Sequence, residues 1–150
     1  MNKVELRRIS DIEELLRWRR EVIENVFGMK PSYNLMQKNK DYYSRHIADG
    51  SHIAYVAVQD CEEIGSGSIC VTEELPSPDN LSGKCAYLMN IYVRRPFRQH
   101  GVGHAIVRKL LEVAQKLDCG KIYLETTEDG RGVYESLGFH DMPDMMKFKS

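Results

Sequence analysis

The stretch LMNIYVRRPFRQHGVG, from Leu88 to Gly103, decides how this chain is organised. It continues an apolar run that starts at Ala86 and is typical of a buried strand. Pro96 interrupts the strand pattern soon afterwards. Gly101 and Gly103 then stand at the beginning of a segment whose apolar residues have helical spacing. The stretch therefore predicts a strand, a tight turn and the start of a helix.

A turn of this composition is suited to hold a phosphate group. The first amides of a helix have no partner within the helix, and its N-terminus carries a partial positive charge. Gly101 and Gly103 lack the Cβ atoms that would keep a pyrophosphate away from those amides, and Arg98 adds a cation beside them. The alternative without a ligand is that the two glycines only let a helix begin close to a sheet.

Other ligands fit the turn less well. The P-loop requires a lysine and a serine or threonine after its second glycine, whereas His104 follows Gly103 here. The dinucleotide fingerprint requires a third glycine where this chain has Ile106. His100 and His104 could share one face of a helix, but no third ligand is placed with them. We therefore expect no metal at this turn.

The rest of the chain predicts a mixed α/β fold in the order β-α-α-β-β-β-α-β-α-β, with a central mixed sheet and helices on both faces. Period-two alternation or short apolar runs indicate strands, and apolar residues at i, i+3 and i+4 indicate helices. The expected helices are 12–26, 35–48, 103–117 and 131–137, and the expected strands are 4–6, 53–58, 64–72, 86–93, 121–126 and a last one that includes 145–148.

Local signals refine these boundaries. Ser10 and Glu13 have the spacing of a capping box, which predicts Ser10 as the N-cap of the first helix. Gly120 follows the third helix and suits a left-handed C-cap. Gly65 and Gly67 indicate a β-bulge within their strand.

Composition restricts the class of protein. The chain has 150 residues, of which 42% are hydrophobic and 29% charged, and a formal net charge of −1. These values predict one globular domain, residues 1–150, and give no electrostatic reason to expect nucleic acid or an anionic membrane as a partner. Four scattered cysteines without a CxxC pair argue against a zinc knuckle or a disulfide framework. With no signal-peptide pattern and no apolar run of about 20 residues, we expect a cytoplasmic protein.

Two separated motifs together resemble the GNAT superfamily of N-acetyltransferases. The stretch from Leu88 to Gly103 is similar to its motif A, and VYESLGF, residues 133–139, is similar to its motif B. The resemblance implies the GNAT-like acyl-CoA N-acyltransferase fold, with a central mixed, splayed sheet flanked by helices. It also implies acetyl-CoA as co-substrate and no metal. Thr127 stands where the family frequently has an asparagine.

The resemblance implies roles for residues of both motifs. The amides of Ile91 and Val93 would pair with the pantetheine arm and the thioester carbonyl, in the gap between two splayed strands. An amide aimed at that carbonyl stabilises the negative charge that develops during attack. A β-bulge near Asn90 would free the amide for this role. The expected cofactor-binding residues are Ile91, Tyr92, Val93, Arg98, Gln99, His100, Gly101, Val102, Gly103, His104 and Thr127.

Proton transfer requires an acid and a base. Tyr134 matches the motif B tyrosine and would protonate the leaving thiolate, because a phenol stays protonated at neutral pH. The alternative is that its ring only packs under the helix. Glu125 and Glu128 lie at and just past the end of a predicted strand, and either could accept the proton of the amine. Each could instead be a solvated carboxylate.

The acceptor is less defined than the donor. We expect direct transfer to a primary amine, on a small-molecule acceptor, with no covalent enzyme intermediate, since no cysteine lies in either motif. An enzyme that acetylates proteins or peptides, and a non-catalytic acyl-CoA sensor, are the alternatives, and a homodimer remains open. The loop carboxylates favour a cationic amine; they are Glu73, Glu74, Asp79, Glu125 and Glu128.

Aromatic and basic residues of the first two helices allow two interpretations. Trp18, Tyr42 and Tyr43 could line an acceptor pocket, because these helices flank that site in the family, or they could pack in the core. The run from Arg17 to Arg20 is interpreted as a solvated helix face with one apolar insertion.

Overall fold

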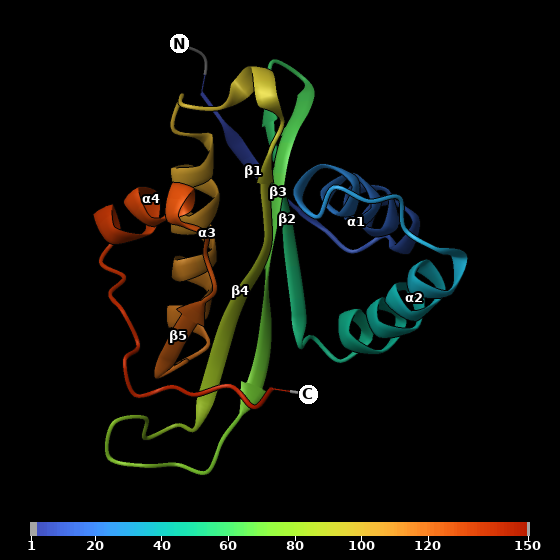
Figure 1. Ribbon diagram of the computed structural model, residues 1–150. Coiled ribbons are helices and arrows are strands. Elements are labelled where there is room, and N and C mark those ends of the chain that lie inside the picture. The colour runs from blue at the N-terminus through green and yellow to red at the C-terminus, as the bar shows by residue number, and fades with distance from the viewer. Residues whose placement is uncertain (1–2, 150) are drawn as a thin grey trace.

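The computed structural model describes residues 3–149 and contains one five-stranded mixed sheet flanked by four α-helices. The strands lie in the order β1-β2-β3-β4-β5, so neighbours in the sequence are neighbours in the sheet. The first four strands are antiparallel, and β5 is parallel to β4. Helices α1 and α2 cover one face and α3 and α4 the other (Figure 1). Among residues 3–149, no helix is long and apolar enough to span a membrane.

The strands follow the predicted pattern with longer ends. Strand β3 is longer than expected because its N-terminal end pairs with β2 from Glu62 and its C-terminal end pairs with β4 as far as Glu73. Strand β5 is shorter than the predicted 121–126, since its ladder with β4 ends at the pair Leu88 and Leu124. The strands are β1 (Glu5–Ile9), β2 (His52–Gln59), β3 (Glu62–Glu73), β4 (Lys84–Val93) and β5 (Lys121–Leu124).

The helices bury one face each against the sheet. Leu15, Trp18 and Val22 of α1 are buried, whereas α4 is short and buries no residue completely. The predicted second helix begins at Tyr33 instead of Leu35, because the Ser32 side chain caps it by accepting a hydrogen bond from the Leu35 amide. The helices are α1 (Ile12–Val26), α2 (Tyr33–Ala48), α3 (Val102–Lys116) and α4 (Arg131–Ser136).

The prediction of Ser10 as the N-cap of α1 was wrong. The cap is Asp11, whose carboxylate accepts a hydrogen bond of 3.0 Å from the Glu14 amide. Both residues are good N-caps, and both have a glutamate three positions later in the sequence. Strand β1 extends to Ile9, which leaves Ser10 as the connection and makes Asp11 the first residue that can cap.

The core is divided by the sheet into two clusters. On the α3 side, the side chains of Ile64, Ile69, Ile106 and Leu110 are fully buried. On the α1 and α2 side, Trp18, Tyr43, Val56 and Tyr92 belong to a second cluster that is richer in aromatic residues. Strands β2, β3 and β4 therefore have buried residues on both faces at their centres, as expected for a sheet covered on both sides.

A β-bulge lies between β3 and β4, as predicted near Asn90. Ser66 pairs with Tyr92 and Ser68 with Met89, so Asn90 and Ile91 together stand opposite Gly67. Asn90 has a left-handed backbone with φ 60°. Gly67 is required because a Cβ atom there would lie 2.6 Å from Ile106 Cγ2. The missing side chain lets α3 pack directly over the bulge.

Gly120 does not have the left-handed conformation predicted for it. Asp118 has that conformation, with φ 62°. Gly120 is instead needed for a close approach, because a Cβ atom there would lie within 2.9 Å of Asn80 Cγ. Asn80 comes from the loop between β3 and β4, which contacts Asp118 and Gly120 just before β5. The glycine signal was real, but its cause is a contact from a distant part of the chain.

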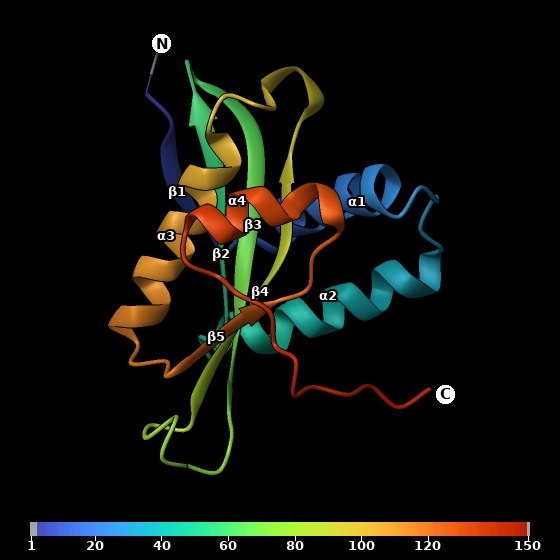
Figure 2. The same ribbon diagram turned by 60° about the vertical axis from the view of Figure 1, so that its left-hand side comes forward.

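The predicted terminal strand over 145–148 was wrong. Residues 139–149 contain no strand or helix and run from α4 across the sheet toward the α2 side (Figures 1 and 2). Met146 is 98% exposed and Phe148 is 92% exposed, so the apolar residues that suggested a strand are not buried. Strand β5 pairs with β4 and with no other strand among residues 3–149.

Candidate active site

The turn between β4 and α3 has two left-handed residues. Gln99 has φ 64° and Gly101 has φ 82°, and Gly101 is the N-cap of α3. Nothing lies within 4 Å of the position that a Cβ atom of Gly101 would occupy. The glycine is therefore explained by its backbone conformation and by open space beside the turn, not by packing.

The first turn of α3 presents free amides. The first helical amide with an acceptor is that of Ala105, which donates to the Gly101 carbonyl at 3.0 Å. The amides of Val102, Gly103 and His104 have no partner among residues 3–149, and no side chain caps this helix. His100 is exposed and His104 is half-buried. Among residues 3–149, no group of three or more His, Cys, Asp or Glu side chains is placed to hold a metal ion. The arrangement suits an anion such as a pyrophosphate.

Arg98 is held at the mouth of this turn. Its Nε donates a hydrogen bond of 2.7 Å to the Val93 carbonyl, and its guanidinium lies 5.7 Å from the centre of the Tyr92 ring. The side chain is otherwise exposed. Arg98 thus links the end of β4 to the turn and leaves a cation close to the free amides. Tyr92 itself is buried in the core and reaches the site only through its backbone and this ring contact.

The bulge alters the direction of the amides at the end of β4. The Arg94 amide donates to the Ile64 carbonyl at 2.9 Å, which fixes the alternation of the ladder beyond the bulge. Because successive residues of an antiparallel pair point their amides to opposite sides, the Val93 amide points to the β5 side, whereas Ile91 lies in the bulge, outside the register of β4 with β3. Strand β5 has already ended at Leu124, opposite Leu88. The Val93 amide therefore lies where no neighbouring strand takes it up.

Tyr134 lies on the α3 side of the sheet, in α4. Its ring packs edge-to-face against Phe139 with 5.8 Å between ring centres, and burial raises the pKa of its hydroxyl. The hydroxyl has no hydrogen-bond partner among the described residues. Tyr134 lines a cleft of about 920 Å³ between β5, α4 and the segment 139–149. Of the predicted site residues, only Tyr134 lines this cleft.

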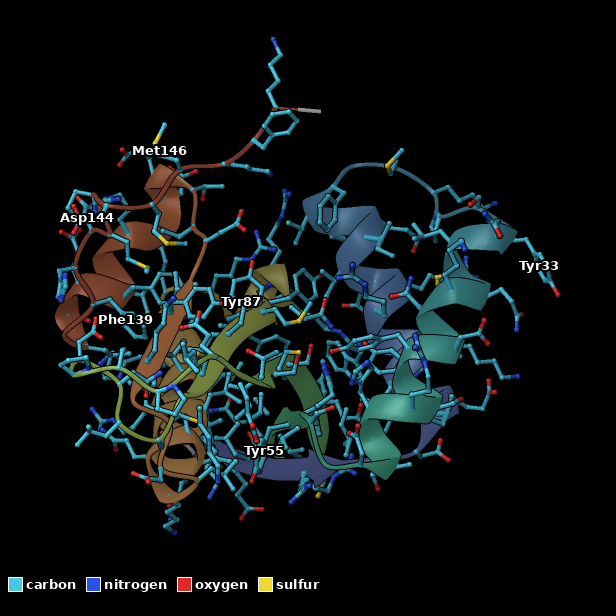
Figure 3. The ribbon with its side chains drawn as sticks, turned by 90° about the horizontal axis from the view of Figure 1, so that it is seen from below. Tyr33, Tyr55, Tyr87, Phe139, Asp144 and Met146 are labelled. Atoms are coloured by element: carbon cyan, nitrogen blue, oxygen red, sulfur yellow. The ribbon has the colours of Figure 1, made fainter. Side chains whose placement is uncertain are left out.

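The two candidate bases have different surroundings. Glu125 accepts a hydrogen bond of 3.2 Å from the hydroxyl of Tyr87, whose ring lies 5.1 Å from that of Tyr123. Burial and the charge of Glu125 both raise the pKa of Tyr87. Figure 3 shows Tyr87 between the α1 and α2 pair and the α4 side. The side chain of Glu128 is 91% exposed and, among residues 3–149, forms an ion pair only with Arg131, at 3.8 Å.

Thr127 is exposed and interacts through its backbone. Its carbonyl accepts hydrogen bonds from the Thr126 hydroxyl and the Gly130 amide, at 3.0 and 3.1 Å. These bonds fix the turn that leads from β5 into α4. In this structure, Thr127 shapes the connection that carries Tyr134.

Trp18 of α1 and Tyr43 of α2 are core residues. Trp18 is buried and donates a hydrogen bond of 3.0 Å to Glu63, and Tyr43 is buried in the same cluster. The hydroxyl of Tyr42 lies 2.9 Å from Nδ1 of His52. The packing interpretation therefore describes Trp18 and Tyr43 better than the pocket interpretation.

Sequence reasoning missed Arg19. The interpretation of residues 17–20 as a solvated face was wrong for this residue, which turns inward and is half-buried. Its Nη1 donates a hydrogen bond of 2.7 Å to the Asn90 side chain and its Nε one of 3.0 Å to Asn39. One sequence signal pointed to this position: Arg19 interrupts the apolar stripe of α1.

The fold is shared with many solved acetyltransferases. A predicted acetyltransferase from Clostridium acetobutylicum, solved with acetyl-CoA, superposes with a TM-score of 0.83 at 22% identity, covering 98% of this chain and 96% of the other. A GCN5-related N-acetyltransferase from Ralstonia eutropha JMP134 superposes with a TM-score of 0.80 at 22% identity, covering 98% of this chain and 99% of the other. Glucosamine-6-phosphate N-acetyltransferase from Arabidopsis thaliana superposes with a TM-score of 0.71 at 18% identity, covering 98% of each chain.

Sequence comparison also finds relatives. A probable glucosamine 6-phosphate N-acetyltransferase 2 from Oryza sativa subsp. japonica is 33% identical over 57 residues, which are 38% of this chain and 34% of that protein. The match thus spans about a third of the length of this curated relative. The sequence pattern of the acetyltransferase (GNAT) family matches residues 12–139, from the first helix to the end of motif B. The chain therefore belongs to the acetyltransferase (GNAT) family.

Proposed function

We propose that residues 1–150 act as one acetyltransferase domain that acetylates the primary amine of a small molecule. When bound, acetyl-CoA supplies the acetyl group and leaves as the CoA thiol. The amine nitrogen forms a bond to the acyl carbon, the carbon–sulfur bond breaks, one proton leaves the nitrogen and one reaches the sulfur. The similarity to glucosamine 6-phosphate N-acetyltransferases supports a small-molecule acceptor.

The observation that carries this proposal is the bulge at Asn90 and Ile91. It takes Ile91 out of the register with β3 and leaves the Val93 amide on the side where β5 has ended, and the free amides of α3 begin one short turn further along the chain. In the proposal, the α3 amides and Arg98 hold the pyrophosphate. Ile91 and Val93 hold the pantetheine arm and the thioester carbonyl, with one amide opposing the charge that develops on that carbonyl.

Glu125 and Tyr134 are the proposed proton acceptor and donor. A neutral amine is needed for attack, and the Glu125 carboxylate is held in place by Tyr87 on the face that α1 and α2 flank. Glu128 is solvated and ion-paired, which makes it the weaker candidate. The raised pKa of Tyr134 keeps its hydroxyl protonated at neutral pH and able to donate to the sulfur.

A thermal melt with acetyl-CoA, CoA, NAD and ATP at equal concentrations tests cofactor binding. A ligand at 100 times its Kd stabilises the folded state by about 2.7 kcal/mol, which raises the midpoint by several degrees. We expect a shift with acetyl-CoA and CoA only. A protein whose midpoint is unchanged by both would use the turn only to start a helix, and the proposal would fail.

Release of CoA thiol in the presence of amines tests turnover. Tyr134→Phe is expected to lower kcat about 100-fold or more while the Kd for acetyl-CoA stays within twofold, because general acids contribute about 10²–10⁴ to the rate. Tyr33→Phe is the matched control, since Tyr33 is 85% exposed on α2. Acetyl-CoA binding without CoA release from any amine or peptide would identify a sensor instead of an enzyme.

The base is tested by a second pair of variants. Glu125→Gln is expected to lower kcat at neutral pH, whereas Glu128→Gln leaves it unchanged. Equal effects of the two substitutions would exclude Glu125 as the specific proton acceptor. Acetylation of peptides in preference to every small amine would favour the protein acetyltransferase alternative.

A further inference from the structure

Arg19 is a half-buried cation without an acidic partner. Among residues 3–149, its side chain makes no ion pair, whereas Arg7, Arg17, Arg94 and Arg131 all pair with carboxylates. A guanidinium has five N–H donors. One on Nε and one on Nη1 are used by the amides of Asn39 and Asn90, so three donors remain without a partner among the described residues. Desolvated cations are normally paired, which makes this arrangement informative.

The two asparagines fix the position of the guanidinium. Asn39 is on α2 and Asn90 is on β4, so hydrogen bonds from two directions hold an arginine that comes from α1. Both partners accept through a neutral amide oxygen. They orient the cation without neutralising it, and its positive charge stays available to a ligand.

The position of Arg19 relates it to the proposed reaction. Its Nη1 lies 2.7 Å from the side chain of Asn90, the bulge residue directly before Ile91. The guanidinium therefore stands within a few ångströms of the backbone proposed to hold the thioester carbonyl. It lies on the α1 and α2 side of the sheet, as do Tyr87 and Glu125. A ligand beside Arg19 would thus lie on the side of the sheet that carries the proposed proton acceptor.

The described groups that interact with the charge of Arg19 are an aromatic ring and two titratable side chains, none of them an anion. The ring of Phe27 lies 5.8 Å from its guanidinium carbon, and the phenol of Tyr43 and the imidazole of His52 are the titratable groups that feel its charge. Both of these groups are buried and uncharged at neutral pH, since burial raises the pKa of Tyr43 and lowers that of His52 to about 4.

We propose that Arg19, held by Asn39 and Asn90, binds an anionic group of the acceptor, a carboxylate or a phosphate carried by the primary amine. This inference rests on the proposed function and names the acceptor class. It replaces the expectation of a cationic amine, which relied on loop carboxylates. Four of those five carboxylates have other partners: Glu74 pairs with Lys121, Asp79 with Ser77, Glu125 with Tyr87 and Glu128 with Arg131.

Four amines of matched length test the acceptor class: β-alanine, O-phosphoethanolamine, ethanolamine and ethylenediamine. They differ in carrying a carboxylate, a phosphate, a hydroxyl and a second amine. We expect kcat/KM for at least one anionic amine to exceed that of ethanolamine by about 10- to 100-fold, the value of a hydrogen-bonded charge pair. The ratio between the two anionic amines distinguishes a carboxylate site from a phosphate site. Preference for ethanolamine or ethylenediamine would overturn the proposal.

Variants assign the preference to Arg19. Arg19→Gln is expected to lower kcat/KM for the anionic amines about 10- to 100-fold, to the value for ethanolamine. The kcat/KM for ethanolamine itself should change less than threefold. Arg19→Lys keeps the charge and should retain part of the preference. Arg20→Gln is the control, because Arg20 is exposed on the same helix. If Arg19→Gln lowers kcat/KM for all four amines by the same factor, or if Arg20→Gln has the same effect, Arg19 has only a structural role.

A binding measurement keeps this test separate from the proposed function. The protein alone is titrated with N-acetyl-β-alanine, N-acetyl-O-phosphoethanolamine and N-acetylethanolamine, with folding of each variant checked by its melting midpoint. Tighter binding of an anionic compound that is lost in Arg19→Gln supports the site even if no amine is turned over. Equal binding of all three compounds to the unsubstituted protein refutes it, even if acetyl-CoA binds and amines are acetylated.

Discussion

The turn from Val93 to Gly103 and the segment 139–149 are both irregular, yet they differ in what holds them. The turn is fixed at both ends, by the ladder of β3 with β4 and by a helix whose Ile106 and Leu110 are fully buried. The segment follows the short helix α4, has no ladder and exposes Met146 and Phe148. The turn is thus fixed by packed regular elements on both sides, whereas among residues 3–149 the segment has a regular element on one side only.

The same difference separates the two halves of the proposed site. The donor half consists of backbone amides whose directions follow from the bulge and the α3 N-terminus. The acceptor half depends on side chains from α1, α2 and β5, which come together only in the fold. Substitutions in the core beside the turn should therefore lower the free energy of unfolding far more than substitutions in the exposed segment 139–149.

The largest expected effect comes from Leu110→Ala, compared with Phe148→Ala. Leu110 of α3 is completely buried, so the substitution should reduce the free energy of unfolding by about 2–5 kcal/mol. Phe148 is 92% exposed, and its substitution should change stability by less than about 0.5 kcal/mol. Urea unfolding of both variants measures the difference. A loss above 1 kcal/mol for Phe148→Ala would mean that the segment is docked in solution.

Gly67→Ala should have the next largest effect. The added methyl group would lie 2.6 Å from Ile106 Cγ2 and 3.2 Å from Ile91 Cγ1, and overpacking of this kind costs about 1–3 kcal/mol. Gly132→Ala is the control, because nothing lies within 4 Å of its Cβ position in α4. It should be neutral or stabilise the protein by up to about 1 kcal/mol. Similar melting midpoints for the two variants would show that α3 does not pack tightly on the bulge.

Much of the fold could be predicted because its signals are local. The apolar runs of β2 and β4 and the stripe of α3 indicate their elements without information from elsewhere in the chain. The errors concern features whose cause is distant. Gly120 is required by Asn80, and an apolar segment such as 145–148 becomes a strand only if an edge pairs with it.

The candidate site was predictable to the extent that it consists of backbone. Gly101 and the bulge at Asn90 follow from residue types and from the family pattern. Arg19 could not be found in this way, because an arginine in a basic run is normally solvated. Its inward position depends on Asn39 and Asn90, which are distant in sequence.

A pH series distinguishes the packed side of the sheet from the exposed segment. His52 is 2% exposed, and burial lowers its pKa to about 4, from an ordinary value of about 6.5. Between these values the unfolded chain binds the extra proton and the folded protein does not. The free energy of unfolding should therefore fall as the pH drops from about 6.5 to about 4, by at most about 1.4 kcal/mol per pH unit from this group.

Substitution of two histidines assigns that slope. His52→Gln should flatten the pH dependence in this window, whereas His140→Gln, in the exposed segment, should leave it unchanged. The measurement is urea unfolding at half-unit pH steps. An unaltered slope in His52→Gln would show that other groups cause the acid sensitivity.

The smallest expected effect concerns the N-cap of α1, where two neighbouring residues compete. Asp11→Ala removes the acceptor of the Glu14 amide and should cost about 1 kcal/mol, whereas Ser10→Ala should cost less than about 0.5 kcal/mol. The Asp11 cap forms because β1 is paired through Ile9 and the chain must turn directly after it. If Ser10→Ala proves the more damaging in urea unfolding, the helix begins one residue earlier and the end of β1 is frayed. The comparison thus measures how firmly a packed strand sets the first residue of the helix that follows it.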